Sequence, residues 1–259
     1  MTRIKNVVLL LLYVLLANSV PAFSQRKAET IITKWAEKPV QIDGSLNDWT
    51  DSLTLYNDAT RLFYSIANDE ENLYLAIRSS SRETLSKILA GGISFSANIE
   101  KKKKDSPKVT FPVLDRTAGR NRNVKNKQAD MQEMQKQTLS KIKEIQVEGF
   151  KEIIDGGISL YNTYGIKAAV AFDVNNNLIQ EIAIPLSLLD LKANRPDLVT
   201  YNIKINGLQR PSGGTMQRQG DPRADMGGMY GGQRPGNAQL DKLLSSTEFY
   251  IKSKLATKQ

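Results

Sequence analysis

Short stretches in which apolar and polar residues alternate recur along the chain, and this pattern predicts β-strands. Residues 201–205 read Tyr-Asn-Ile-Lys-Ile, so that one face is apolar and the other polar, as in a strand with one buried face. Residues 61–67 and 72–78 are separated by the polar residues 68–71, which predicts a hairpin with a solvated tip. Further strands are expected over 29–41, 93–99, 108–113, 166–173, 178–184 and 246–255.

A short helix is predicted after the hairpin. Ser81 is a suitable N-cap for residues 82–89, because its hydroxyl can accept a hydrogen bond from a free amide of the first turn. Gly91 and Gly92 are suitable residues to end this helix.

The segment from about 115 to 145 is charged and contains no aromatic residue. It places Met131, Met134, Leu139 and Ile142 at loosely helical spacing, which predicts an amphipathic helix inserted between strands, with a narrow apolar stripe. Two interpretations of the stripe are open: it packs on the domain, or it binds a protein partner.

Residues 210–239 are rich in Gly, Arg, Gln and Met and show no pattern of buried positions. Such a stretch buries too little apolar surface to offset the entropy of ordering, so it is predicted to be a flexible loop. Strand character returns over 246–255, which makes the stretch a loop within the domain and not a tail. We therefore expect a single domain over 25–259, with insertions at about 115–145 and 210–239.

The first 24 residues have the organisation of a secretory signal peptide. Arg3 and Lys5 precede an apolar run over 7–16, and small residues follow up to Ser24. The run is shorter than the roughly 20 residues that span a bilayer. We expect cleavage near Ser24 and an exported protein, periplasmic or secreted, with no transmembrane segment in the mature chain and no nucleic acid as a partner.

The chain contains no cysteine and no histidine. Disulfides, histidine bases, the common catalytic triads and the usual zinc sites are therefore excluded. Carboxylate pairs such as Asp43 with Asp48, or Glu148 with Glu152, are explained by turns and solvated faces as well as by glycoside hydrolysis. We expect no enzyme activity and no cofactor.

Three short motifs occur in a fixed order along the chain. Residues 42–49 read Ile-Asp-Gly-Ser-Leu-Asn-Asp-Trp, residues 69–78 lead from an acidic turn into Leu-Tyr-Leu-Ala-Ile-Arg, and residues 181–185 read Glu-Ile-Ala-Ile-Pro before Leu189. Together they resemble the motifs of the type 9 carbohydrate-binding modules and of the wider DOMON-like superfamily. The resemblance implies an all-β, antiparallel β-sandwich of jelly-roll-like form, with short helices and one inserted amphipathic helix.

The first motif is mainly architectural. Asp43 and Gly44 suit a tight turn, because glycine tolerates positive φ and aspartate bonds its own backbone. Asp48 and Trp49 follow in the same corner. Trp49 is expected to fill the core, with a sugar-stacking platform as the alternative.

Candidate ligand-binding residues come from the resemblance, which implies aromatic rings that clamp a sugar. Tyr64 and Tyr74, on neighbouring strands of the hairpin, could form a stacking face, with ordinary sheet packing as the alternative. Tyr230 is the ring in the Gly-rich stretch before the last strand, where a clamp aromatic is expected. The remaining indole besides Trp49 is Trp35.

The resemblance also implies a haem group or a metal ion in some relatives. Without histidine, the usual haem ligation is excluded. Asp173, Asn175, Asn177 and Glu181 offer oxygen ligands at the tight spacing of calcium sites. An Asn-rich hairpin turn explains these residues without an ion, and we expect no metal.

Two functions are open. The first is an exported, non-catalytic module that binds a glycan or a cell-envelope polysaccharide. The net charge of +9, which includes Arg3 and Lys5 of the first 24 residues, favours an acidic one, with the solvation of the two inserted segments as the alternative role of this charge. The second is a structural or assembly protein that contacts an envelope protein through the inserted helix and the Gly-rich loop. Exposed aromatics beside polar groups would favour the first, and an apolar insertion surface the second.

Overall fold

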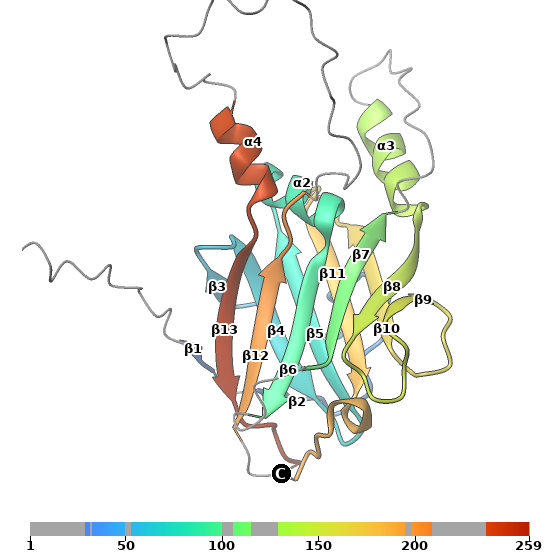
Figure 1. The fold of residues 1–259 in the computed structure, drawn as a ribbon, viewed down its shortest axis with the longest axis vertical. Helices are drawn as coiled ribbons and strands as arrows, with labels where there is room; N and C mark the ends of the chain where they lie inside the picture. The colour runs from blue at the N-terminus through green and yellow to red at the C-terminus, as the bar shows by residue number, and fades with distance from the viewer. Residues whose placement is uncertain are drawn as a thin grey trace, which may run out of the picture.

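The computed structural model describes residues 29–31, 33–49, 53–99, 106–114, 129–194, 198–208 and 237–258. Within these residues the strands form two sheets that face one another (Figure 1). The seven-stranded sheet has, in spatial order, β1 (Glu29–Thr30), β13 (Thr247–Ser253), β12 (Val199–Ile205), β6 (Ile93–Ile99), β7 (Lys108–Leu114), β8 (Ile142–Glu148) and β9 (Gly156–Ser159). The six-stranded sheet has β10 (Lys167–Phe172), β11 (Leu178–Pro185), β5 (Asn72–Ser79), β4 (Leu62–Asn68) and β2 (Lys34–Trp35), with β3 (Leu55–Asn57) also paired to β4.

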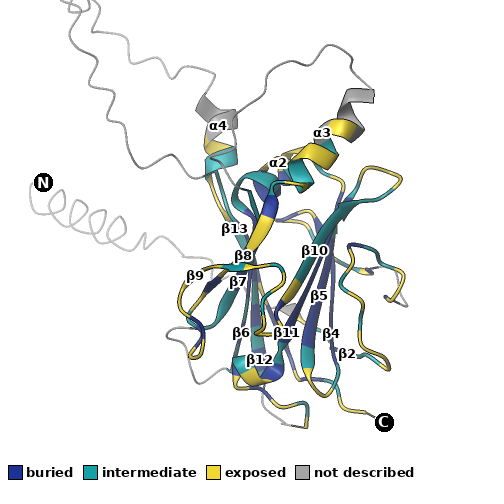
Figure 2. Ribbon diagram, turned by 90° about the vertical axis from the view of Figure 1, so that its right-hand side faces the viewer, coloured by how far each residue is buried: buried dark blue, intermediate teal, exposed yellow. Residues whose placement is uncertain are grey.

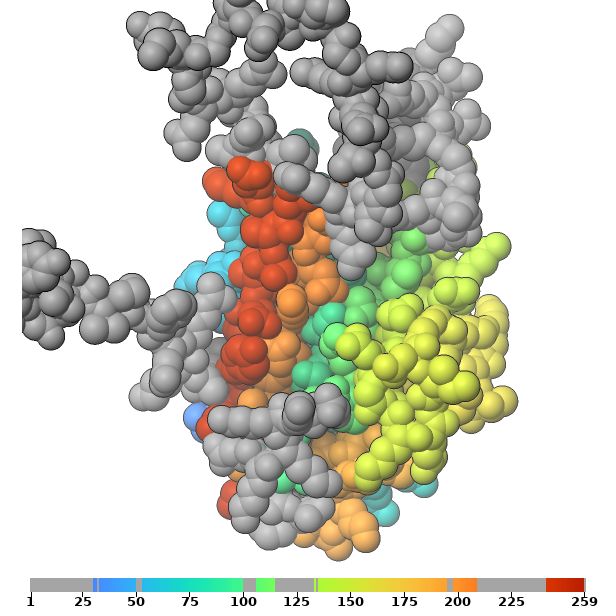
Figure 3. Space-filling view, viewed as in Figure 1, coloured from blue at the N-terminus to red at the C-terminus, as the bar shows by residue number. Residues whose placement is uncertain are grey.

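The prediction of an all-β sandwich is confirmed. The long strands of both sheets pair antiparallel, including the predicted hairpin of β4 and β5. Figure 3 shows β13, β12, β6, β7 and β8 side by side on the outer surface of the seven-stranded sheet. Helices α2 (Arg82–Gly91), α3 (Ala129–Leu139) and α4 (Asn237–Leu244) lie at one end of the sandwich, and the short 3-10 helix η1 (Leu186–Leu189) lies at the other (Figure 1).

The N-terminal segment joins the two sheets. β1 pairs parallel with β13, whereas β2 pairs parallel with β4 of the other sheet. Between them the amide and hydroxyl of Thr33 donate hydrogen bonds to the Ser253 hydroxyl at 3.0 and 2.7 Å. The single strand predicted over 29–41 is therefore wrong: the segment makes two short strands because it passes from one sheet to the other.

The main core fills the space between the sheets. It follows from the alternation of each strand: along β12, the side chains of Tyr201, Ile203 and Ile205 are buried and the intervening ones are partly exposed, as the sequence pattern predicts. The aromatic rings of this core include Phe95, whose centroid lies 6.0 Å from that of Tyr201.

A second apolar cluster covers the outer face of the six-stranded sheet. Trp49 and Leu53 pack there with Ala67, Tyr74 and Ala183. The described part of the segment 36–53 therefore acts as an additional layer. Because both faces of this sheet are covered, β5 is buried along most of its length (Figure 2).

Helix α2 is confirmed with the predicted capping. The Ser81 hydroxyl accepts a hydrogen bond from the Thr84 amide at 3.4 Å. At the other end Gly92 has φ of 74°, and a Cβ there would lie 2.7 Å from the Pro112 carbonyl oxygen. A residue with a side chain would be strained at this position.

The predicted inserted helix is confirmed only in part. Helix α3 ends at Leu139, and Ile142 already belongs to β8, so the prediction of a helix up to 145 is wrong at its C-terminal end. β8 pairs with β7, and its β-branched Ile142, Ile145 and Val147 are buried in the main core, so this sheet packing overrides a weak helical spacing. Residues 115–128 lie outside the described part of the chain.

Other sequence predictions lie wholly or partly outside the described residues. Residues 1–28, with the predicted signal peptide, and residues 209–236 of the predicted Gly-rich loop belong to this group. The loop was predicted to reach 239, but α4 begins at Asn237. None of the helices in the described ranges combines the length and the apolar character that crossing a membrane requires.

Candidate functional site

Two hollows share lining residues near the C-terminal segment, and the larger one is also lined by η1. Figure 1 shows η1 and the C-terminus at the same end of the sandwich. The volumes of the two hollows are about 980 and 680 Å³, and both are lined by Trp35 and Thr257. We call them together the Trp35 cleft. The walls of the larger hollow come from the β4–β5 turn, the start of β10, η1 and the residues after it: Glu70, Glu71, Asn72, Gly165, Lys167, Pro185, Leu186, Ser187, Leu191, Lys192, Ala193 and Asn194, with Thr257 and Lys258.

Trp35 is positioned by the short parallel pairing of β2 with β4. In this register Trp35 lies beside Asn68, and its side chain is half-buried. A large ring that remains partly open to solvent between two hollows is available to a ligand. Trp49, in contrast, is only 8% exposed and lies in the outer apolar cluster.

The rim of the cleft is ordered by Asp69. Its Oδ1 accepts hydrogen bonds from the amides of Glu71 and Asn72 at 2.8 and 2.6 Å. The Leu186 amide donates to the Glu71 carbonyl at 2.7 Å, which joins η1 to the same turn. The side chains of Glu71 and Asn72 therefore project from a fixed backbone.

Tyr74 holds Asp69, and through it this rim, from the buried side of the turn. Its hydroxyl donates a hydrogen bond to Asp69 Oδ2 at 2.5 Å, and its side chain is only 2% exposed. Burial, and then the neighbouring Asp69, raise the pKa of the Tyr74 hydroxyl, which stays protonated as a donor. Tyr74 therefore acts on the cleft through Asp69 and does not line it.

The C-terminal segment forms one wall of the cleft and is held by Asn68. The Asn68 amide group donates to the Ala256 carbonyl at 3.0 Å, and its oxygen accepts from the Ala256 amide at 2.8 Å. Asn68 is buried, and this two-way contact keeps the adjacent Thr257 at the wall that Trp35 also lines.

The residues that line the cleft suit a polar ligand with an apolar face. Glu70, Glu71, Asn72 and Lys167, whose side chains carry carboxylate, amide and ammonium groups, line the same hollow as the indole. The lining thus offers both hydrogen-bond donors and acceptors. Within the described ranges, no group of three or more Asp or Glu side chains is arranged to hold a metal ion.

The tyrosines considered from the sequence are not brought together. Tyr64 is fully buried between the sheets, with its ring 5.1 Å from that of Phe249. Tyr74 is buried on the opposite face of the same sheet, in the outer cluster. These two residues therefore do not form a common stacking face, and both pack within the sheet layers. Tyr230 lies outside the described residues.

The corner at 43–49 is closed by a buried carboxylate. Glu181 Oε2 accepts from the amides of Asp43 and Gly44 at 3.2 and 2.8 Å, and its Oε1 accepts from Trp49 Nε1 at 2.7 Å. Burial raises the pKa of the Glu181 carboxyl, and the three donors oppose this shift without cancelling it. Gly44 has φ of 84°, and a Cβ there would meet the Ala171 methyl group at 2.8 Å.

Of the four carboxylates considered for glycoside hydrolysis, Asp43, Asp48 and Glu148 make structural contacts, and Glu152 is exposed. Asp43 Oδ1 accepts from the Ser45 amide and Asp48 Oδ2 from the Gln41 amide, each at 2.8 Å. Glu148 pairs with Lys108 at 2.6 Å across β7 and β8, with more than half of its side chain exposed. These contacts are those of turns and of a solvated sheet face.

The oxygen-bearing residues considered for calcium are used in two separate places. Asp173 Oδ1 accepts from the amides of Asn175 and Asn177, both at 2.8 Å, and Oδ2 accepts from the Asn177 side chain at 2.8 Å. Glu181 is engaged in the Trp49 corner. The first three residues thus build the β10–β11 turn, and Glu181 does not join them.

The Asp173 turn gives a prediction about pH. Partial burial raises the pKa of Asp173, but the hydrogen bonds from Asn177 and Asn175, with Arg78 nearby, outweigh it, so the pKa lies below its ordinary 3.8. Because the folded pKa is depressed, this stabilisation is present above pH 3.8 and is lost as the pH falls through the folded pKa. We expect Asp173→Asn to lower the free energy of unfolding by about 1 kcal/mol at about pH 7, and by less in acid.

Urea unfolding of both proteins across this pH range measures the difference. Asp241→Asn, at an exposed position of α4, is the matched control and is expected to show little change. A cost for Asp173→Asn that stays constant down to the acid limit would contradict the role of the ionised carboxylate.

Sequence reasoning did not find the Trp35 cleft. Its walls come from β2, the β4–β5 turn, η1 and the C-terminus, which lie far apart in the chain. Two features of the sequence could have indicated it: Trp35 is an indole with no expected place in the core, and residues 69–71 form an acidic turn within the second motif.

Comparisons with known proteins give similarity to solved structures only. No protein-family model matches the chain, and no curated protein does. Among solved structures, the chain is similar to a carbohydrate-binding module of family 9 from Caldicellulosiruptor kristjanssonii in complex with glucose, with 9% sequence identity and a TM-score of 0.38. The similarity covers 89% of this chain and 98% of the other. A likeness of this size does not indicate what the present chain binds.

Proposed function

We propose that this chain is a non-catalytic binding module and that its Trp35 cleft takes a segment of a glycan. The observation that carries the proposal is the position of Trp35: it is a half-buried indole that lines both hollows, and residues with carboxylate, amide and ammonium groups line the larger hollow with it. The cleft is large enough for more than one sugar unit, since ligand sites range over roughly 300 to 1,000 Å³.

The chemistry of sugars fits this arrangement. A pyranose ring has C–H groups on its faces, which pack on an indole, and hydroxyl groups on its rim, which bond to polar side chains. In the larger hollow of the cleft, Glu71, Asn72 and Lys167 line the wall together with the indole of Trp35. Orientation and specificity then come from the polar groups, and contact area from the ring.

The wider setting is also part of the proposal. The signal-peptide pattern of residues 1–24 favours export, which brings the module to polysaccharides of the cell envelope or outside the cell. Kinship with the DOMON-like superfamily stays a prediction from the motifs at 42–49, 69–78 and 181–185. Lysines and glutamates both line the cleft, so neutral and acidic glycans are both to be tested.

Removing the indole tests the proposal. On affinity gels or a glycan array that includes neutral and acidic polysaccharides, we expect Trp35→Ala to weaken binding by about tenfold or more, which corresponds to a lost contact of about 1.4 kcal/mol. Trp35→Phe should retain part of the affinity, because a smaller ring still stacks.

Tyr161→Ala is the matched control for the loss of an exposed aromatic. Tyr161 is 93% exposed and does not line either hollow, so its loss should leave binding unchanged. If Trp35→Ala and the starting protein bind equally well, the Trp35 cleft is not the binding site. If the starting protein is retained on no polysaccharide, the chain does not bind a glycan.

The assembly alternative depends on other parts of the chain. The Gly-rich segment and the side chains of Met131 and Met134 lie outside the described residues, so a protein partner there stays a prediction. Failure of every glycan in the test above is the outcome that favours it.

A further inference from the structure

A separate polar cleft lies at the opposite end of the sandwich. It has a volume of about 330 Å³ and lies between the turn at 58–61, helix α2 and the start of β13. Three cationic side chains line it, those of Arg61, Lys87 and Lys242. We call it the Lys87 cleft.

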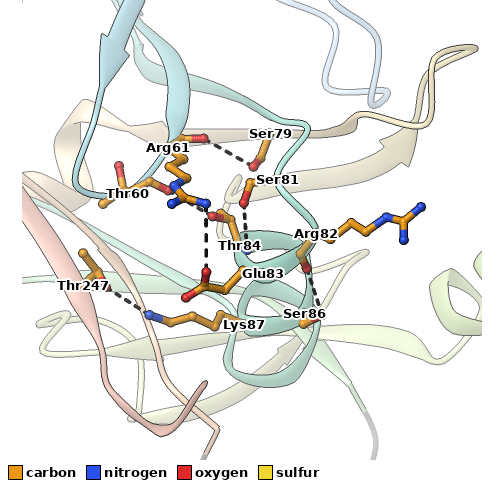
Figure 4. A network of polar contacts seen from close by, with 10 residues as sticks. All are labelled: Thr60, Arg61, Ser79, Ser81, Arg82, Glu83, Thr84, Ser86, Lys87 and Thr247. Carbon is orange, nitrogen blue, oxygen red and sulfur yellow. Dashed lines mark hydrogen bonds and ion pairs between the residues drawn. The ribbon is translucent and has the colours of Figure 1, made fainter. Parts of the chain in front are cut away.

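Lys87 is unusual because its charged side chain is buried. It is 6% exposed, and its Nζ donates a hydrogen bond to the Thr247 hydroxyl at 3.0 Å (Figure 4). Within the described residues no carboxylate lies within ion-pair distance of this Nζ. An ammonium group has three donors, and burying it with a single hydroxyl acceptor leaves it short of partners.

The electrostatics of Lys87 agree with this geometry. Burial lowers the pKa of its ammonium group, and the charge of Glu83, one helical turn earlier on α2, acts in the opposite direction. An anionic group inside the cleft would supply the missing acceptors and the missing counter-charge at once.

Arg61 stands at the mouth of the same cleft in a strained conformation. Its φ is 55°, a value that a residue with a long side chain rarely adopts. Its carbonyl accepts from the Ser79 hydroxyl at 3.4 Å, and the preceding Thr60 carbonyl accepts from the Thr84 hydroxyl at 3.3 Å. The turn is thereby fixed from two sides, as Figure 4 shows, and strain held in this way is common at binding sites.

The charges of the cleft favour an anion. Against the three cations stand the carboxylates of Asp58 and Glu83. Glu83 lies 3.9 Å from the Arg61 guanidinium, with both side chains close to half exposed or more, so this pair is weak and solvent-screened. The Thr247 hydroxyl accepts from Lys87 and keeps its own proton to donate.

We propose that the Lys87 cleft binds an oxyanion, a sulfate, phosphate or carboxylate group, with the buried Lys87 ammonium as its main contact and Arg61 and Lys242 at its edge. The anion is either free or a substituent of an acidic sugar. This site is distinct from the Trp35 cleft and does not depend on it, because the two lie at opposite ends of the sandwich.

Calorimetric titration at constant ionic strength tests the proposal, with sodium sulfate, sodium glucuronate and, as the neutral comparison, glucose. We expect the starting protein to bind sulfate or glucuronate but not glucose at this site, and Lys87→Met to bind the anion about tenfold more weakly or worse. Binding of sulfate indicates a free oxyanion, and binding of glucuronate alone indicates an acidic sugar. Methionine keeps the length of the apolar stem, which lets the helix pack as before.

Lys151→Met is the control for loss of a lysine, because Lys151 is a largely exposed residue paired with Asp190 away from this cleft. If Lys87→Met fails to fold, Arg61→Gln tests the same cleft from its exposed edge. This variant is expected to lower the affinity for the anion by at least about threefold. The proposal is overturned by the absence of anion binding, or by equal affinity in the starting protein and the variant tested. Neutral glycan retention through Trp35 should be unchanged in Lys87→Met, so that the two sites fail or succeed separately.

Discussion

Replacing Glu181 by glutamine is expected to lower the free energy of unfolding by about 3 kcal/mol. Its two oxygens accept from three donors, the amides of Asp43 and Gly44 on one side and Trp49 Nε1 on the other. Each carboxyl oxygen keeps a lone pair whether or not the group is protonated, but the amide nitrogen of glutamine has none to offer. The side-chain NH2 group of the new glutamine would therefore face at least one N–H donor of the corner at a fully buried position.

Denaturant unfolding at about pH 7 measures this loss. Glu152→Gln, at an exposed position, makes the same chemical change on the surface and should cost little. Trp49→Phe removes one donor from the Glu181 contact, so the double variant should lose less than the sum of the two single ones. Additive losses would show that Trp49 and Glu181 are not energetically coupled.

Replacing the preceding residue, Gln180, by methionine is expected to raise the free energy of unfolding by about 2 kcal/mol. Gln180 is 1% exposed, and in the described part of the chain neither polar atom of its side chain has a hydrogen-bond partner. It projects into the main core on the same face of β11 as Leu178 and Ile182. An apolar side chain of similar shape removes the cost of an unsatisfied amide without leaving a void.

Thermal and denaturant unfolding of Gln180→Met check this gain, with an unchanged denaturant slope. Gln146→Met on β8 is the control, since Gln146 is exposed on the outer face of the other sheet and the same change there should be close to neutral. If Gln180→Met is less stable than the starting protein, the side-chain amide of Gln180 has a hydrogen-bond partner in solution, such as a bound water molecule.

Gln180 and Glu181 also show what a single sequence can and cannot predict. The strand over 178–184 was predictable from its run of apolar residues and the following Pro185. The burial of both adjacent polar residues was not, because alternation places one of them on the outer face of the sheet. Glu181 on that face is covered by the segment around Trp49, more than a hundred residues earlier.

The long strands and the capped helix α2 were predictable because their signals are local. Alternation, turn residues and Ser81 with Gly92 all act within a few positions. Strand β8 was not predicted, because Ile142, Ile145 and Val147 are placed by pairing with β7. Helix α4 was not predicted either, since it follows directly on a stretch of low complexity.

The separation of Tyr64 and Tyr74 was within reach of the sequence. In the hairpin Asn68 pairs with Leu73, so Tyr64 pairs with Ile77 and Tyr74 with Ala67. Successive residues face opposite sides, which puts the two rings on opposite faces. The Trp35 cleft was not predictable from the sequence, because no local pattern indicates which distant turns lie near an indole.

The contacts of the Trp49 corner have a consequence for how the protein is made. The hydrogen bonds to Glu181 join residues 132 to 138 positions apart, and those of Thr33 to Ser253 span 220. As the chain grows on the ribosome, the hydrogen bonds of the corner to Glu181 form only after Glu181 has been synthesised. Those of Thr33 form only after the last strand has been synthesised. Contacts this remote slow folding, because a long stretch of chain must close into a loop before each of them forms.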